Sequence, residues 1–345
     1  MKQRVLLVGC GEHASENLIP SLIGIGSVEV TGICDNNIDA IARAARWFPN
    51  ATEIHKQQLI DQDVIDYDAL VVAATPQVHE HVARLAISLG KPVFVEKPPA
   101  VFTEQLREMA DIARERRVTT CVGHNLRHSD AAIQFQTSIA DPGFGRPVAM
   151  EMRYLSSKPR GIRWGLTSSL RSFLLSHANH AIDLMIYQMG AISHVVAARA
   201  SPDVDGGIAI TVQFIFKSGA VGNLLATSYA PHFTLSATVL SDSGCVALMN
   251  GLYDVQVHGR HPMGKRWANS WQPRTLETGF RFAGYQTELE RFFIAIANNT
   301  PDHVHPSFAD EVDIYEAMDS IEASIESSAV GSSPASALVS GKPSL

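Results

Sequence analysis

The stretch RVLLVGCGEHA, residues 4–14, decides the fold because it joins an apolar run to a glycine-rich turn. The apolar residues 5–8 predict a buried strand. In the turn, Gly9 permits a sharp bend, Gly11 lets the backbone approach a phosphate, and Ala14 allows the next helix to pack closely. The free N–H groups at the start of that helix attract anions. The pattern therefore predicts a dinucleotide site whose phosphates rest on Gly9, Cys10, Gly11, Glu12, His13 and Ala14.

Asp35 ends the second predicted strand, residues 28–34. A carboxylate at this place accepts hydrogen bonds from both hydroxyls of an adenosine ribose and repels a 2′-phosphate. The next residues, Asn36 and Asn37, supply no cation for such a phosphate. NAD is therefore favoured over NADP, and the alternative is a structural turn followed by an Asp that caps a helix.

The first third of the chain alternates short apolar runs with helical patterns. Strands are predicted at residues 4–8, 28–34, 69–73, 93–96 and 119–123, and helices at 38–47, 79–89 and 103–116, the last with Thr103 as N-cap. Strands that are apolar throughout are typical of a parallel sheet buried on both faces. We therefore expect an α/β domain of the doubly wound Rossmann type over residues 1–123.

After residue 123 the pattern changes to alternating strands. These are predicted at residues 147–155, 194–200, 208–217, 220–229, 236–240 and 245–249, with a hairpin turn at 217–219 and helices at 176–189, 284–298 and 308–326. Alternation indicates an antiparallel sheet with one face in water. Residues 124–330 are thus predicted to form an α+β domain with an open, mostly antiparallel sheet, and the Ser-, Gly- and Pro-rich residues 331–345 a flexible tail.

The amino-acid composition argues against several classes of function. The 345 residues include 28 basic and 35 acidic side chains, a net charge of −7, which argues against nucleic acid as a partner. No apolar run is long enough for a membrane helix, and no signal peptide is recognised at the N-terminus. The four cysteines are far apart and the histidine pairs lack further ligands, so no metal site is predicted. We expect a cytoplasmic protein.

Lys97 lies just past the end of the strand at residues 93–96, before two prolines. Open α/β sheets bind their ligands at the carboxyl ends of the strands. A partly desolvated lysine at that edge has a lowered pKa and can transfer protons, and the prolines stiffen the turn that holds it. The alternative is an exposed lysine at a strand end.

Together these residues resemble the Gfo/Idh/MocA family, named after glucose-fructose oxidoreductase and inositol dehydrogenase. The likeness rests on the GxGxxA turn, Asp35, the segment Ala73-Ala74-Thr75-Pro76 with His79, and Glu96-Lys97-Pro98, and it continues through Asn125 and Arg127 to the helix at 309–324. The resemblance implies hydride transfer between NAD and a secondary alcohol of a sugar or cyclitol, and a homo-oligomer, either a dimer or a tetramer. It also implies that Ala74, Thr75, Pro76 and His79 lie near the nicotinamide half, with Glu96 beside the ribose or the lysine.

In this family the lysine contacts the reacting oxygen, and an Asp and a His four residues apart complete the site. By position these are Lys97, Ser176 and His180, so a serine replaces the aspartate. A serine can orient a hydroxyl but cannot accept a full proton as a carboxylate does. Catalysis is therefore assigned to Lys97 and His180, with Ser176 and Asn179 as orienting groups.

Residues 152–182 contain no acidic side chain but include Arg153, Lys158, Arg160, Arg163 and Arg171. Arginine forks suit carboxylates and phosphates, which predicts an anionic group on the substrate. Expected substrate-binding residues are Lys97, Asn125, Arg127, Arg163, Trp164, Arg171, Asn179 and His180. The alternative is a solvated basic loop.

The primary prediction is a NAD(H)-dependent oxidoreductase acting on a small sugar derivative that carries an anionic group. Three alternatives stay open: an NAD-dependent glycosidase, an imine reductase, and a catalytically silent NAD-binding regulator, which the loss of the aspartate would permit.

Overall fold

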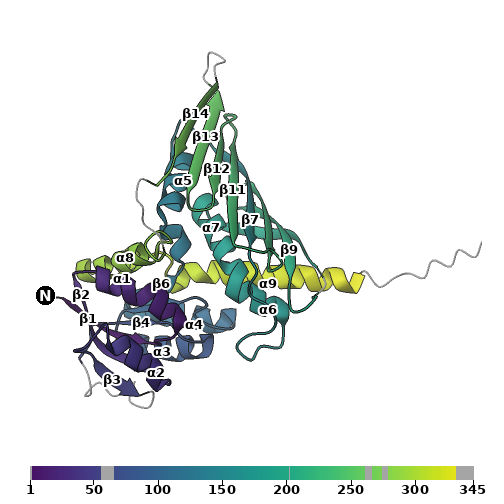
Figure 1. Cartoon of the computed structure of the whole chain (residues 1–345). Helices are drawn as coiled ribbons and strands as arrows, with labels where there is room; N and C mark the ends of the chain where they lie inside the picture. Colours follow the sequence, from purple (N-terminus) through teal and green to yellow (C-terminus); the bar gives the residue numbers. More distant parts are fainter. Residues whose placement is uncertain (1, 56–65, 202, 261–265, 274–278, 332–345) are drawn as a thin grey trace, which may run out of the picture.

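The chain builds two β-sheets in succession, each with helices packed against it (Figure 1). The computed structural model describes residues 2–55, 66–201, 203–260, 266–273 and 279–331. In Figure 1 the first sheet lies in the lower part of the molecule, and the second rises above it to a narrow end at β13 and β14. The long helix α9 (Phe308–Gly331) runs between the two.

The first sheet confirms the predicted doubly wound fold. Within the described residues it has six strands in the order β3-β2-β1-β4-β5-β6, and the paired strands are parallel. The strands are β1 (Gln3–Val8), β2 (Val28–Asp35), β3 (Thr52–His55), β4 (Ala69–Val72), β5 (Val93–Glu96) and β6 (Thr120–Gly123). Strand order reverses between β1 and β4, and this switch point is where such sheets bind dinucleotides.

Helices connect these strands. They are η1 (Ala14–Leu18), which continues into α1 (Ile19–Gly24), then α2 (Ile38–Ala45), α3 (Pro76–Ser88) and α4 (Thr103–Arg116). The prediction of Thr103 as an N-cap is wrong, because α4 begins at Thr103 itself. The side chain of Gln105 accepts the N–H of Phe102 at 2.9 Å, and the Thr103 hydroxyl donates instead to Asp319 of α9.

The second sheet is the open, mostly antiparallel sheet that was predicted. Its order in the described chain is β14-β13-β12-β11-β7-β10-β9-β8, and only the β7–β10 pair is parallel among the paired strands. The strands are β7 (Pro147–Leu155), β8 (Ile192–Ala200), β9 (Ala209–Phe216), β10 (Val221–Thr227), β11 (Thr234–Ser241), β12 (Val246–Asn250), β13 (Asp254–Arg260) and β14 (Arg266–Trp271). The predicted hairpin turn joins β9 to β10, with Gly219 at φ +85°.

Several elements escaped prediction because their local signals are weak. Strand β3 is a four-residue strand with polar residues at both ends, and β14 is exposed along most of its length. Strand β13 and helix α5 (Asp130–Ala140) were also missed. The predicted helix at 176–189 is one continuous helical run made of α6 (Ser169–Phe173), η4 (Leu174–Ala178) and α7 (Asn179–Met189).

Helix α8 (Tyr285–Asn298) returns from the second half of the chain to the first sheet. Its residues Leu289, Phe292 and Phe293 belong to the same buried cluster as Leu7 of β1. The ring of Phe292 meets that of Phe94 on β5 edge to face, with centroids 6.1 Å apart. The core of the first unit therefore includes residues far beyond position 123, and the predicted boundary at that position stays a prediction.

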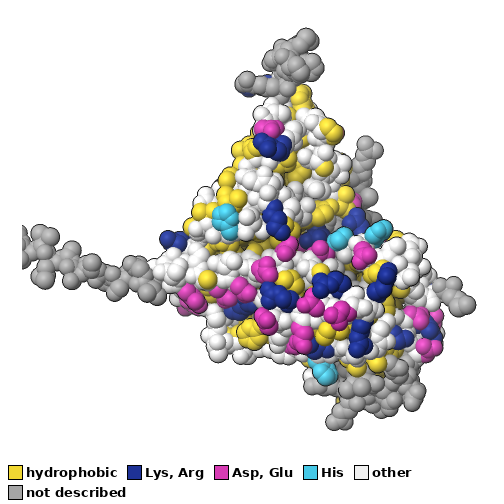
Figure 2. All heavy atoms as spheres, turned by 180° about the vertical axis from the view of Figure 1, so that it is seen from behind, with side chains coloured by type: hydrophobic (Ala, Val, Ile, Leu, Met, Phe, Trp, Pro, Cys, Tyr) yellow, Lys and Arg dark blue, Asp and Glu magenta, His cyan; other side chains and the backbone are white. Residues whose placement is uncertain are grey.

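In the described residues, no helix has both the length and the apolarity needed to span a lipid bilayer. Figure 2 shows acidic and basic side chains side by side over the lower half of the rear face. The predicted tail, residues 331–345, lies outside the described residues except for Gly331, which ends α9.

Candidate functional site

The glycine-rich turn is built to admit a ligand. Gly9 has φ +90°, and a Cβ on it would lie 2.0 Å from the carbonyl oxygen of Ala73 at the end of β4. A Cβ on Gly11 would meet nothing within 4 Å. Position 9 therefore requires glycine, because any side chain there would clash with the neighbouring strand. Gly11 leaves open space at the start of the helix, where anions bind.

Asp35 lies directly beside this turn. Its Oδ2 accepts the N–H of Cys10 at 2.7 Å and its Oδ1 accepts the N–H of Asn37 at 2.8 Å. A cavity of about 590 Å³ opens in front of it, lined among others by Gly9, Gly11, Asp35, Asn36, Ala74 and Thr75. These six belong to the predicted cofactor residues, and the donors and space that they provide fit a dinucleotide.

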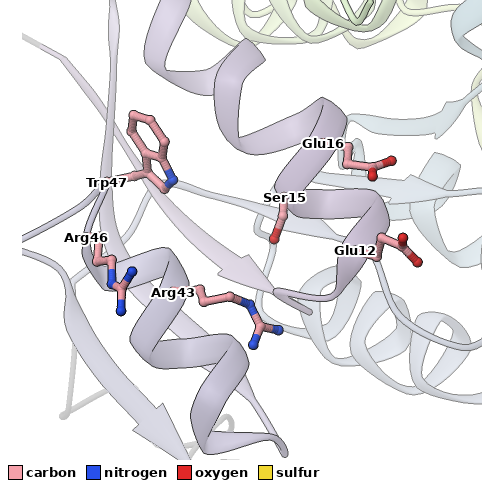
Figure 3. Close-up of a pocket in the computed structure, with 6 residues that line it drawn as sticks. All are labelled: Glu12, Ser15, Glu16, Arg43, Arg46 and Trp47. Carbon is pink, nitrogen blue, oxygen red and sulfur yellow. The ribbon is translucent and has the colours of Figure 1, made fainter.

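A second cavity, of about 580 Å³, lies between η1 and α2 (Figure 3). Glu12, Ser15 and Glu16 line it from the glycine-rich turn and η1, and Arg43, Arg46 and Trp47 from α2 and the turn after it. The charge of Arg43 also reaches the buried thiol of Cys10. From the sequence, only Asn36 and Asn37 were weighed as the place of a cation for a 2′-phosphate. Arg43 was missed because α2 brings this cation back toward the turn.

His79 joins two strand ends rather than facing the cavity. It is 1% exposed, its Nε2 accepts the N–H of Ala74 at 2.7 Å, and its Nδ1 lies 2.8 Å from the carbonyl oxygen of Pro98. Since Nε2 accepts, the proton must be on Nδ1, which donates to Pro98. Burial lowers the pKa of His79 to about 4, so the ring is neutral. His79 therefore positions the loop that carries Lys97.

Lys97 lies at the end of β5 and contacts the second half of the chain. Its Nζ donates to the carbonyl oxygen of Ser176 at 3.1 Å. Burial lowers the pKa of Lys97, the charge of Glu96 opposes this, and Arg163 adds to the lowering. A lowered pKa makes the lysine a better proton donor, which is compatible with the predicted catalytic role.

The Ser176 carbonyl that meets Lys97 belongs to the wide helical turn η4. The N–H of Asn179 reaches back five residues to the carbonyl of Leu174, and the Asn179 side chain donates to Leu175 at 2.7 Å. The side-chain oxygen of Asn179 accepts the N–H of His180 at 2.8 Å. Both polar ends of Asn179 thus bond within the helix, and its role as a substrate-orienting group stays a prediction.

The Ser176 side chain also departs from expectation. Its hydroxyl donates to the backbone carbonyl of Ser172 in the preceding turn. It is therefore the backbone of Ser176, and not its hydroxyl, that contacts Lys97. Sequence spacing could not show this, because the wide turn rotates the residues relative to a regular α-helix.

His180 is the second expected catalytic residue, and the fold places it near Lys97. Burial lowers the pKa of His180 well below its ordinary range, and the charge of Lys97 lowers it further. Its ring meets that of His124 edge to face at 5.4 Å, and Tyr154 lies 6.2 Å away. The Nδ1 atom is buried with no hydrogen-bond partner. His180 is therefore a neutral imidazole, and it lies close enough to Lys97 for the charge of the lysine to act on it.

Three predicted substrate residues have partners inside the protein. Arg127 forms a two-pronged ion pair with Asp183, and Asn125 donates to the carbonyl of Ala283 at 2.8 Å. Arg171 is 7% exposed and bonds Asp319 at 2.8 Å, Glu322 at 3.0 Å and the Val101 carbonyl at 3.0 Å. Each of these side chains is therefore buried and already paired inside the protein, and substrate binding by them stays a prediction.

Arg163 and Trp164 fit their predictions better. Arg163 is exposed and close enough to Lys97 to lower its pKa, and no carboxylate pairs with it among the described residues. Trp164 is partly buried, and its carbonyl accepts from Gln77, which also lines the cofactor cavity. The loop carrying both residues thus borders the cavity.

Sequence reasoning missed Glu288, which faces the interior from α8. It is 1% exposed, and neither carboxyl oxygen has a hydrogen-bond partner. Burial, with the nearby charge of Glu96, raises the pKa of Glu288 well above its usual range, so it holds a proton. The signal was present in the sequence, because Glu288 lies one turn before Phe292 on the apolar stripe of its helix.

Comparison with known proteins gives a consistent pattern. Residues 3–124 match the Gfo/Idh/MocA family, described as an oxidoreductase family with a NAD-binding Rossmann fold. The 1,5-anhydro-D-fructose reductase of Ensifer adhaerens is 31% identical over 166 residues, which are 45% of this chain and 49% of that protein. The chain therefore matches about half the length of this relative.

Solved structures extend the likeness over both sheets. A dehydrogenase from Chromobacterium violaceum is 31% identical with a TM-score of 0.87, covering 95% of this chain and 97% of that one. Levoglucosan dehydrogenase in complex with NADH shares the fold, with a TM-score of 0.79 at 21% identity and coverage of 95% and 98%.

Proposed function

This chain belongs to the Gfo/Idh/MocA family of oxidoreductases, and on that premise we propose that it is a NAD(H)-dependent dehydrogenase. Its substrate class would be a sugar, a cyclitol or a related polyol, oxidised at a secondary alcohol or reduced at the matching carbonyl. The observation that carries the proposal is Lys97, with its lowered pKa, at the switch-point edge of the sheet and within the field of the neutral His180.

NAD, when bound, supplies the carbon that accepts or returns the hydride. Gly11 and the start of η1 would hold its phosphates, and Asp35 its adenosine ribose. The Asp35 carboxylate supports NAD over NADP by repelling a 2′-phosphate. Arg43 is the opposing feature, since it is a cation near the same turn.

The residues around Lys97 suggest how the proton moves during the reaction. In alcohol oxidation the Lys97 ammonium donates a hydrogen bond to the reacting oxygen and stabilises the negative charge that develops on it. The hydroxyl proton passes to the neutral imidazole of His180, which is free to accept it. Because the Ser176 hydroxyl is directed at Ser172, this pair works without a carboxylate partner.

Arg163 supports an anionic group on the substrate. Of the arginines in the basic segment, Arg171 is neutralised by two carboxylates and Arg153 pairs with Glu151. Arg163 keeps an exposed guanidinium beside Lys97. A sugar acid or sugar phosphate would present its charge to this side chain.

The test is turnover on a panel of neutral and acidic polyols, with NADH and NADPH titrated by fluorescence. Lys97→Met should lower kcat by about 10²–10⁴ while NADH still binds. Arg163→Ala should raise KM about tenfold for acidic substrates only. Arg153→Ala removes an exposed arginine that pairs with Glu151; it is the matched control and should leave KM unchanged.

Three results would contradict the proposal. Absence of dinucleotide binding would remove the cofactor role, and full activity in Lys97→Met would remove the catalytic assignment. Product formation with no net change in NADH would indicate a glycosidase instead.

A further inference from the structure

His13 occupies the space between the phosphate cradle and the reacting end of the site. It lies two residues beyond Gly11, and its Nε2 is 3.1 Å from Oε1 of Glu96, the residue before Lys97. The ring of Tyr285 on α8 meets it edge to face, with centroids 5.5 Å apart. His13 thus joins the segment after Gly11 to the residue before Lys97, the two segments that a dinucleotide on Gly11 would bridge to reach Lys97.

The two members of this contact differ in exposure. The Glu96 side chain is 5% exposed, whereas that of His13 is 43% exposed and can exchange protons with water. Attraction to the Glu96 charge raises the pKa of His13, although burial works against it. Burial would raise the pKa of Glu96, but the charges of His13 and Lys97 outweigh it, so the carboxyl is ionised.

The other groups around His13 come from five elements. Glu16 on η1 raises the pKa of His13, and Lys97 at the end of β5 lowers it. His79 on α3 and His180 on α7 are neutral, since burial lowers the pKa of each. On α8, Tyr285 is held neutral by burial, and Glu288 keeps its proton. The local charge at neutral pH therefore comes from Glu16, Glu96, Lys97 and the proton on His13.

We propose that His13, held by Glu96, is a positioning residue that makes the choice between oxidised and reduced cofactor depend on pH. The inference rests on the proposed function, because it requires a nicotinamide dinucleotide in the cavity. The oxidised nicotinamide ring carries a positive charge that the reduced ring lacks. An imidazolium beside it repels the oxidised form, whereas a neutral imidazole does not.

The direction of the pH dependence follows from the coupling between cofactor binding and protonation of His13. Binding of NAD⁺ lowers the pKa of His13, so a proton is released and NAD⁺ binds more tightly as pH rises through that pKa. NADH has the same phosphate charges but no ring charge, so the ratio of the two dissociation constants isolates the effect. This ratio should change about tenfold for each unit by which the ring lowers the pKa.

The experiment is calorimetric titration of NAD⁺ and NADH from about pH 5.5 to about pH 9, a range that brackets an ordinary histidine. In the wild-type protein the ratio of Kd for NAD⁺ to Kd for NADH should rise as pH falls. His13→Gln should make it independent of pH, and Glu96→Gln should move the transition to lower pH because His13 loses its partner. His194→Gln, an exposed histidine on β8, is the control and should match wild type.

Repeating the NAD⁺ titration in two buffers of different ionisation enthalpy counts the protons released. Release in the wild-type protein and none in His13→Gln would support the proposal. A ratio independent of pH in wild type, or an unchanged slope in His13→Gln, would overturn it while leaving the proposed function intact. If neither cofactor binds wild type at any pH, the proposed function itself fails.

Discussion

At the residue scale, single side chains join segments that the sequence shows only separately. His79 is the clearest case, because it connects the loop after β4 to the loop that carries Lys97. The sequence placed this residue near the nicotinamide on the basis of family likeness. The structure shows instead that both ring nitrogens are used for backbone groups.

His79 should make stability depend on pH. Its folded-state pKa is about 4 and its unfolded value 6.5, so the unfolded chain binds the proton more tightly. The stability that neutral His79 contributes is fully present above about pH 6.5 and is lost as pH falls toward 4. The free energy of unfolding should fall by about 3 kcal/mol at most across this range.

The measurement is the free energy of unfolding of wild type and His79→Gln across that window. The advantage of wild type should shrink as pH falls. His81→Gln on the same helix, exposed and without this burial, is the control and should show no such trend. A difference independent of pH for His79→Gln would mean that folding leaves the pKa of His79 unchanged.

At the element scale, the wide turn η4 determines what the second half of the chain offers to Lys97. The turn carries the backbone carbonyl that accepts from the ammonium, and Asn179 bonds the Leu175 carbonyl and the His180 N–H beside it. Wide turns of this kind cost stability unless a local side chain compensates, and they are frequent at functional sites.

Replacement of Asn179 by Ala should therefore destabilise the protein by about 1–3 kcal/mol, since the Leu175 carbonyl and the His180 N–H lose a buried partner. Because the turn holds Ser176 against Lys97, kcat should fall as well. Denaturant unfolding and steady-state kinetics measure the two effects. Asn223→Ala, exposed on β10, is the matched control. Equal stability of both variants would show that η4 needs no support from Asn179.

At the scale of the whole molecule, the first sheet is completed by the end of the chain. Helix α8 contributes Leu289, Phe292 and Phe293 to the core beside β1 and β5, and α9 packs along α4 and β8. The Arg171 contacts to Asp319 and Glu322 attach α9 to the helical run that carries His180. The two sheets are thus linked through helices rather than through one flexible connection.

Phe292→Ala should destabilise the protein by about 3–5 kcal/mol, because its ring is fully buried against Phe94. The loss should also weaken NADH binding, since Phe94 belongs to the strand that ends at Lys97. Ile294→Ala on the same helix is 58% exposed and should change stability by less than about 0.5 kcal/mol. Similar losses in both variants would contradict the role given to α8.

The sequence by itself determined the features that neighbouring residues control. The strand, glycine turn and helix at residues 4–14, the alternation of strands and helices, and the position of Lys97 after a strand all follow from local conformational preference and apolar periodicity. For the same reason the hairpin at Gly219 and most strands of the second sheet were predictable. The expected domain boundary, oligomer and cytoplasmic location stay predictions.

Only the tertiary structure decided which polar groups are free. The sequence does not show that Arg127 and Arg171 are paired with carboxylates. Arg127 bonds Asp183, which is 56 residues away along the chain, and Arg171 bonds Asp319, which is 148 residues away. Glu96 acquires His13, and Glu288 enters the interior without a partner, through the same long-range packing. Charge pairing and desolvation depend on which segments cross in space, and no local pattern encodes that crossing.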